Sequence, residues 1–145
     1  FDGGRKVDQE TEIAGGCMCG AVRYEGTGKP LYIGYCHCRS CRRHSGAAVA
    51  GMLVFNADKV SITARDLSIY NSSPGVERGF CSHCGTSLTW QGRGLISLHI
   101  GTLDDPDAHA PTLHWRHEER SPWCDVGRDL PQVRMQFPAT SAKPA

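Results

Sequence analysis

The chain has 145 residues, enough for one domain with a modest core. Its net charge of +1, with 39% hydrophobic and 21% charged residues, excludes a disordered chain, an acidic tail protein and a strongly basic protein that coats nucleic acid. No apolar run approaches the roughly 18 residues of a membrane span, and the polar start FDGGRKVDQETE lacks the apolar stretch of a signal peptide, so no membrane association is expected.

One domain is expected over residues 13–137, between a flexible N-terminal segment (1–12) and a flexible tail (138–145). Seventeen glycines and eight prolines indicate many turns and therefore short strands. AVRYE alternates apolar and polar residues like a half-buried strand, whereas AAVAGMLVF is an apolar run that fits a strand buried on both faces. In chain order, the expected strands are 21–25, 31–35, 47–55, 59–63, 67–70, 86–90, 95–100 and 132–137.

Helix is scarce in the sequence pattern. About two helical turns are expected over 38–44, ended by Gly46, and a short turn is expected over 104–108 with Pro106 near its first position. Closely spaced short strands are typical of a sandwich or a partly open barrel. The sequence therefore predicts a mostly β protein that is stabilised in part by metal.

Eight cysteines occur in close clusters, which favours metal binding over disulfides. Cys17 and Cys19 are two positions apart, as are Cys36 and Cys38, and a disulfide within either pair would close a small, strained ring. Thiols separated by one or two residues are typical of metal chelation. Because no export signal is visible, we expect a cytoplasmic protein with thiolates bound to metal.

Two of the clusters share a feature of zinc knuckles: glycine follows the second cysteine, where the chain must turn tightly and a positive φ is needed. They are Cys17-Met-Cys19-Gly20 and Cys81-Ser-His-Cys84-Gly85. Two thiolates from each would complete a tetrahedral four-cysteine zinc site. Such a site would connect distant parts of the chain, so the metal should contribute to folding free energy.

The third cluster, Cys36, Cys38 and Cys41, has no knuckle glycine. In a helix over 38–44, Cys38 and Cys41 would share one face, and Cys36 would reach the same point from the preceding strand. Three thiolates with one open position are the arrangement of a catalytic zinc, which acts as a Lewis acid or holds a substrate thiol as thiolate.

Other interpretations of this cluster remain open. A protein ligand could close the site and make both metals structural; the candidates are Cys124, His37, His44 and His83. Four thiolates also suit iron, and a redox dithiol at Cys38 and Cys41 is a weaker option.

Three arginines accompany the third cluster. Arg39, Arg42 and Arg43 could offset the negative charge of a three-thiolate zinc, recruit an anionic substrate through its carboxylates, or be solvated surface charge. A near-neutral chain lacks the basic footprint expected for nucleic-acid binding. A general acid or base could come from His99, His114, His117 or Glu118, but ordinary structural roles explain these residues equally well, and the predicted site does not include them.

The order of several segments resembles the glutathione-dependent formaldehyde-activating (GFA) enzymes, a group that includes the centromere protein V domain. The segments are GGCMCGAVRYE (15–25), CHCRSCRRHSGA (36–47), RGFCSHCGTSL (78–88), GTLDDP (101–106) and LHWRHEERSPWCDVGRDLP (113–131). The resemblance covers roughly residues 13 to 135, and the cysteine triplet is its most specific part.

The resemblance implies an Mss4-like, zinc-stabilised fold of short antiparallel strands. It implies a structural zinc on Cys17, Cys19, Cys81 and Cys84, and a catalytic zinc with an open position on Cys36, Cys38 and Cys41. The implied reaction is that of a carbon–sulfur lyase, which joins glutathione or a related thiol to formaldehyde as S-hydroxymethylglutathione. The alternative is a non-catalytic two-zinc module that binds a protein or nucleic acid.

Overall fold

The computed structural model describes residues 11–63 and 65–133. Of the terminal segments expected to be flexible, residues 1–10 and 138–145 lie outside this description. Among the described residues, no helix is long and apolar enough to cross a bilayer.

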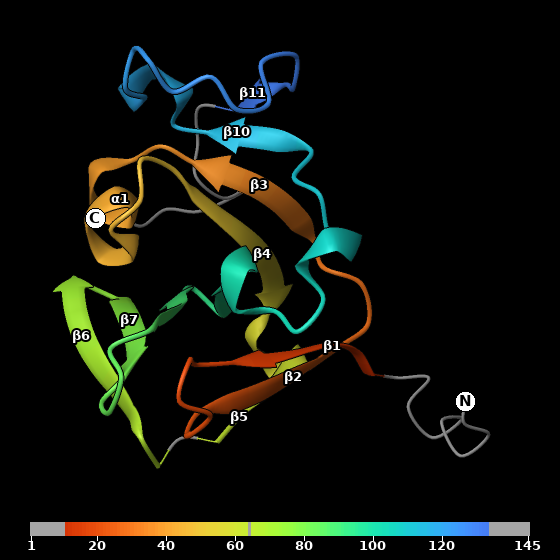
Figure 1. Ribbon diagram of the computed structural model, residues 1–145, viewed down its shortest axis with the longest axis vertical. Helices are drawn as coiled ribbons and strands as arrows, with labels where there is room; N and C mark the ends of the chain where they lie inside the picture. The colour runs from red at the N-terminus through yellow and green to blue at the C-terminus, as the bar shows by residue number, and fades with distance from the viewer. Residues whose placement is uncertain (1–10, 64, 134–145) are drawn as a thin grey trace.

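Eleven short strands, one α-helix and four single 3₁₀ turns make up the described chain (Figure 1). The strands are β1 (Thr11–Gly16), β2 (Arg23–Thr27), β3 (Tyr32–Cys36), β4 (Ala50–Asn56), β5 (Val60–Ile62), β6 (Leu67–Ser73), β7 (Val76–Cys81), β8 (Ser87–Gly92), β9 (Leu95–His99), β10 (Leu113–Trp115) and β11 (Gln132–Val133). The helical elements are α1 (Arg39–Ser45), η2 (Ala57–Lys59), η3 (Ile100–Thr102), η4 (Pro106–Ala108) and η5 (His117–Glu119).

The strands form a small sheet in the order β1-β2-β5 and a large sheet in the order β11-β10-β3-β4-β9-β8-β7-β6. Pairing is antiparallel except around β10, which runs parallel to both β3 and β11. Figure 1 shows the small sheet apart from the β3–β4–β10 region, with α1 beside the end of β3 and the start of β4. The predicted mostly β class is therefore confirmed.

Strand β4 separates two apolar clusters, because its side chains alternate between the faces of the large sheet. Leu53 and Phe55 join a cluster with residues of the small sheet, such as Tyr24. Met52 and Val54 point the other way and join a cluster that contains the three cysteines of the third motif. The expectation of a strand buried on both faces is thus confirmed, and the cysteine triplet belongs to a packed core.

All the strands expected between residues 21 and 100 occur, with ends displaced by no more than three residues, and β11 occupies the start of the expected strand 132–137. The helix is displaced by one residue, and the short turn over 104–108 is η4. Strands β1, β7 and β10 were not expected. Their sequences, TEIAGG, VERGFC and LHW, are too polar, glycine-rich or short for alternation to reveal them.

The parallel packing of β10 on β3 depends on the absence of a side chain at Gly34. A Cβ there would lie 2.6 Å from Leu113 Cδ1 and 2.8 Å from Trp115 Cζ3. We expect Gly34→Ala to lower the free energy of unfolding by about 1–3 kcal/mol, as overpacking does, in a urea titration. Gly101→Ala is the matched control, since no heavy atom lies within 4 Å of its Cβ position. Equal stability of both variants would contradict this account of the β3–β10 contact.

Candidate metal centres

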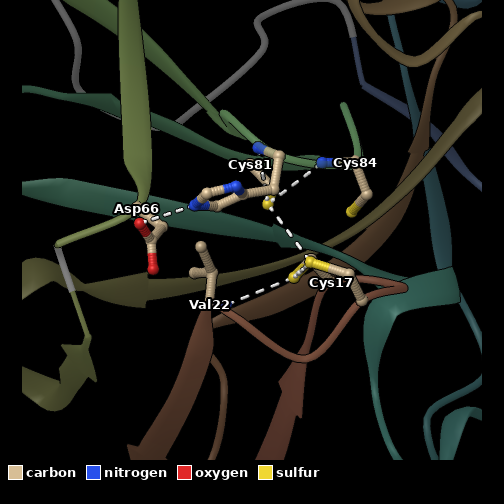
Figure 2. Close-up of polar contacts among 7 residues, drawn as sticks. Cys17, Val22, Asp66, Cys81 and Cys84 are labelled. Carbon is tan, nitrogen blue, oxygen red and sulfur yellow. Dashed lines mark hydrogen bonds and ion pairs between the residues drawn. The ribbon is translucent and has the colours of Figure 1, made fainter.

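Four thiols converge from two turns that are far apart in the sequence. The ligand atoms of Cys17, Cys19, Cys81 and Cys84 all lie within 4.8 Å of one another. The Sγ of Cys19 is 3.6 Å from that of Cys17 and 3.8 Å from that of Cys81. Figure 2 shows Cys17 facing Cys81 and Cys84 across the gap between the two turns.

The glycines after these pairs adopt the predicted conformation. Gly20 has φ 86° and Gly85 has φ 79°, a region that side-chain-bearing residues rarely enter. The N–H of Gly20 donates to the carbonyl of Cys17 at 3.2 Å, and that of Gly85 donates to the carbonyl of Cys81 at 2.9 Å. Each tight turn therefore returns the second thiol of its pair towards the first.

Hydrogen bonds to sulfur prepare these thiols for a metal. The N–H of Val22 donates to Cys17 Sγ at 3.2 Å (Figure 2). The N–H of His83 donates to Cys81 Sγ at 3.3 Å. The Thr86 hydroxyl lies 3.1 Å from Cys84 Sγ, and its hydrogen bond lowers the pKa of Cys84 to about 5. Four converging thiols with donors aimed at sulfur suit a tetrahedral ion that prefers soft ligands.

The third group of thiols is assembled where β3 runs into α1. Cys36 ends β3, Cys38 is the N-cap of α1, and Cys41 lies in its first turn. Their ligand atoms lie within 4.8 Å of one another, and the three residues are 0–2% exposed. Gly46 ends the helix in the left-handed conformation, as predicted. The sequence argument that placed three thiols at one point is therefore matched by the geometry.

The Sγ of Cys38 takes the capping role that a serine or aspartate oxygen usually has, accepting a hydrogen bond from the N–H of Cys41 at 3.3 Å. Hydrogen bonds with Cys36 and Cys41 lower the pKa of Cys38 to about 2. For Cys36, hydrogen bonds with Cys38 and Cys41 instead raise the pKa well above its usual range. Hydrogen bonds among the three thiols therefore favour the thiolate form of Cys38.

In the described part of the chain, no histidine, carboxylate or further thiol joins the triplet at this distance. The residues that could have closed the site have other neighbours. His83 pairs with Asp66 at 2.8 Å beside the four-thiol group (Figure 2), and the ring of His44 lies 5.4 Å from that of His99. Cys124, which is half-buried, follows a turn closed by its N–H to Ser121.

His37 belongs to a buried chain of hydrogen bonds. His114 Nε2 lies 2.7 Å from the Gly127 carbonyl and must donate to it, so His114 Nδ1 accepts from His37 Nε2 at 2.8 Å. Burial lowers the pKa of His37 to about 4, which keeps its ring neutral and leaves Nδ1 as an acceptor. These hydrogen bonds hold the ring of His37, the residue between Cys36 and Cys38 in the sequence, against β10. His117, a sequence candidate, packs edge-on against both rings.

The three arginines of the motif lie in different environments. Arg39 and Arg43 are exposed on α1, whereas Arg42 is half-buried and donates from Nε to the His37 carbonyl at 3.0 Å. The backbone N–H of Arg39 donates to Glu119 at 3.1 Å, which joins the start of α1 to η5. The Nε of Arg42 thus stabilises the backbone at His37, between the first two cysteines of the triplet.

A fourth arginine, which the sequence argument did not select, contacts the triplet directly. Arg78 on β7 is 2% exposed, and its Nη1 donates to Cys41 Sγ at 3.6 Å. Arg78 is the first residue of the segment RGFCSHCGTSL, which is one of the segments that carry the family resemblance. Its place in that segment is the one feature of the sequence that could have pointed to it. Burial of a charged residue in a strand without apolar alternation could not be inferred from the pattern.

Comparisons with known proteins identify the family of the chain. The family model of the glutathione-dependent formaldehyde-activating enzymes matches residues 12–119. A Halomonas elongata protein named "Putative glutathione-dependent formaldehyde-activating enzyme" is 36% identical over 127 residues, covering 79% of this chain and 80% of that protein. A Schizosaccharomyces pombe protein named as an uncharacterized lyase is 30% identical over 77 residues, or 53% of this chain and 56% of that one.

A solved structure of a Rhodobacter sphaeroides protein is similar in fold, with a TM-score of 0.52 at 23% identity, over 83% of this chain and 99% of that one. The cysteine clusters on this mostly β architecture are consistent with the Mss4-like fold. With the family model matching most of its length, the chain belongs to the glutathione-dependent formaldehyde-activating family.

Proposed function

We propose that this protein is a zinc-dependent enzyme of the carbon–sulfur lyase type that joins glutathione, or a related thiol, to formaldehyde at Cys36, Cys38 and Cys41. The observation that carries the proposal is a triplet of converging thiols that no fourth protein ligand joins in the described residues. Membership of the GFA family supports the substrate class.

The two groups of thiols suit different roles. Cys17, Cys19, Cys81 and Cys84 supply all four ligands of a tetrahedral zinc, which is the composition of a structural site. The triplet supplies three ligands and leaves one position to a non-protein ligand, which is the composition of a catalytic site. A zinc ion held there supplies positive charge that keeps a thiol as thiolate or polarises an aldehyde oxygen.

The reaction forms a carbon–sulfur bond and an O–H bond, and it breaks the S–H bond and the π bond of the carbonyl. The thiol of glutathione loses its proton, its sulfur adds to the carbon of formaldehyde, and the carbonyl electron pair moves to the oxygen, which then takes up a proton. The protein would align sulfur and carbon in a water-poor environment, because the triplet is buried. A substrate thiol would reach the buried triplet through local opening, which costs less than global unfolding.

Arg39 and Arg43 would recruit the substrate. Their side chains are exposed on the helix that carries two ligands of the triplet, and glutathione has two carboxylates. The eight free thiols of the structure support a reducing compartment such as the cytoplasm.

Metal content separates the two centres. We expect two zinc ions per chain in the wild type, and one in either Cys38→Ser or Cys81→Ser, measured by elemental analysis of purified protein. Cys81→Ser should also lose much of its stability, because that centre connects the small sheet to the large one. Cys124→Ser is the matched control and should keep both ions. Loss of an ion from Cys124→Ser would show that Cys124 is a ligand.

Activity should depend on the triplet. We expect the wild type to accelerate exchange between glutathione, formaldehyde and S-hydroxymethylglutathione, measured by exchange NMR against the uncatalysed rate. Folded Cys38→Ser should return the rate to the uncatalysed value, and Cys124→Ser should keep it. A wild type that holds both zinc ions without accelerating exchange would instead favour a non-catalytic binding module.

A further inference from the structure

The buried guanidinium of Arg78 contacts the triplet, and the proposed function gives it no role. Arg78 is 2% exposed, Nη1 donates to Cys41 Sγ at 3.6 Å, and Nε donates to Ser72 Oγ at 2.9 Å. Two of its nitrogens thus hold the plane of the guanidinium in a fixed orientation against the sulfur group.

The charge of Arg78 requires a negative partner. In the described residues, no carboxylate forms an ion pair with it, and a buried charge without compensation is strongly destabilising. Three thiolates around a divalent ion carry one net negative charge, so the loaded triplet supplies that partner. The positive charge of Arg78 therefore favours a negatively charged group in this part of the interior.

A third nitrogen of Arg78 has no hydrogen-bond partner. Nη2 is buried and unpartnered, and so are His44 Nε2 and His99 Nε2. The ring centroids of the two histidines are 5.4 Å apart, and the positive charge of Arg78 acts on both rings. Unsatisfied buried polar atoms are rare in proteins, so Nη2 of Arg78 and the two histidine nitrogens near Arg78 indicate a site for a small polar species.

The histidines of this cluster are uncharged. Burial lowers the pKa of His99 to about 3 and also lowers the pKa of His44, with Arg78 contributing in the same direction to each. Arg78 therefore supplies the positive charge of the cluster, and the species that best satisfies Nη2 is an oxygen that carries negative charge.

We propose that Arg78 is a catalytic residue whose Nη2 donates a hydrogen bond to the substrate oxygen that becomes negative when a thiolate adds to an aldehyde carbon. This inference rests on the proposed function. Carbon–sulfur bond formation moves the carbonyl electron pair onto that oxygen, and a fixed donor in a water-poor site stabilises the developing charge most strongly in the transition state. The same donor should bind a small oxyanion when no aldehyde is present.

Formate is a suitable probe because it has one carbon and carries its charge on oxygen. Binding is measured on protein loaded with Co²⁺, from the change in visible absorption on titration, and does not depend on activity. We expect Arg78→Gln to weaken formate binding by about tenfold or more, as loss of a charge-assisted hydrogen bond does, with two metal ions still bound. Arg128→Gln, at an exposed position outside both groups of thiols, is the matched control and should bind formate like the wild type.

Two milder variants cover the case in which Arg78→Gln does not fold. Arg78→Lys keeps the charge without the planar fork, and Ser72→Ala removes the acceptor that orients Nε. Both should weaken formate binding. In the exchange assay, each should lower kcat, by up to about 10²-fold, with little change in KM for glutathione, because the interaction is made in the transition state.

The outcomes are separable. A wild type that binds formate through Arg78 but does not accelerate exchange would overturn the proposed reaction and the catalytic role of Arg78 while leaving its oxyanion site. An active wild type whose folded Arg78 and Ser72 variants bind formate and turn over normally would overturn the role of Arg78 and leave the reaction standing.

Discussion

The sulfur atoms of Cys36, Cys38 and Cys41 lie within 4.8 Å of one another in the protein interior, and the arrangement of their surroundings depends on the charge that they carry. Three thiolates cannot be buried so close together without cations, since each uncompensated buried charge is strongly destabilising. A divalent ion would remove most of that charge, and Arg78, which donates to Cys41 Sγ, would offset the remainder. The N–H of Cys41, which donates to Cys38 Sγ, also stabilises negative charge on sulfur.

The fold holds this group from several sides. β3 brings Cys36 to the end of a central strand, α1 carries the other two thiols, and the parallel strand β10 fixes His37 through His114. The four-thiol group connects the turn after β1 to the turn after β7, the strand that also carries Arg78. A structural metal there would therefore help to position a side chain of the other centre.

Much of both centres could be predicted from the sequence, because thiol spacing and the glycines at 20 and 85 act locally. Most strands followed from short-range alternation, and the cap at Gly46 from turn chemistry. Strand β7 could not be predicted, because Glu77, Arg78 and Gly79 interrupt any apolar pattern. The same interruption hid the role of Arg78, whose burial depends on α1 and on strands paired across the sheet. The sequence shows the three arginines of the motif. It does not show which of them are exposed and which donates to a backbone carbonyl, because both depend on tertiary packing.

We propose that the triplet accepts a substrate thiol at a position that no protein ligand takes. Cadmium NMR on protein loaded with ¹¹³Cd²⁺ tests this directly, because each centre gives its own resonance, and the one lost in Cys38→Ser belongs to the triplet. On addition of glutathione, the triplet resonance should move towards that of the four-thiol centre, which should not move. If the triplet resonance already has the chemical shift of a four-thiolate ion and does not move when glutathione is added, the triplet has no open position for a substrate thiol.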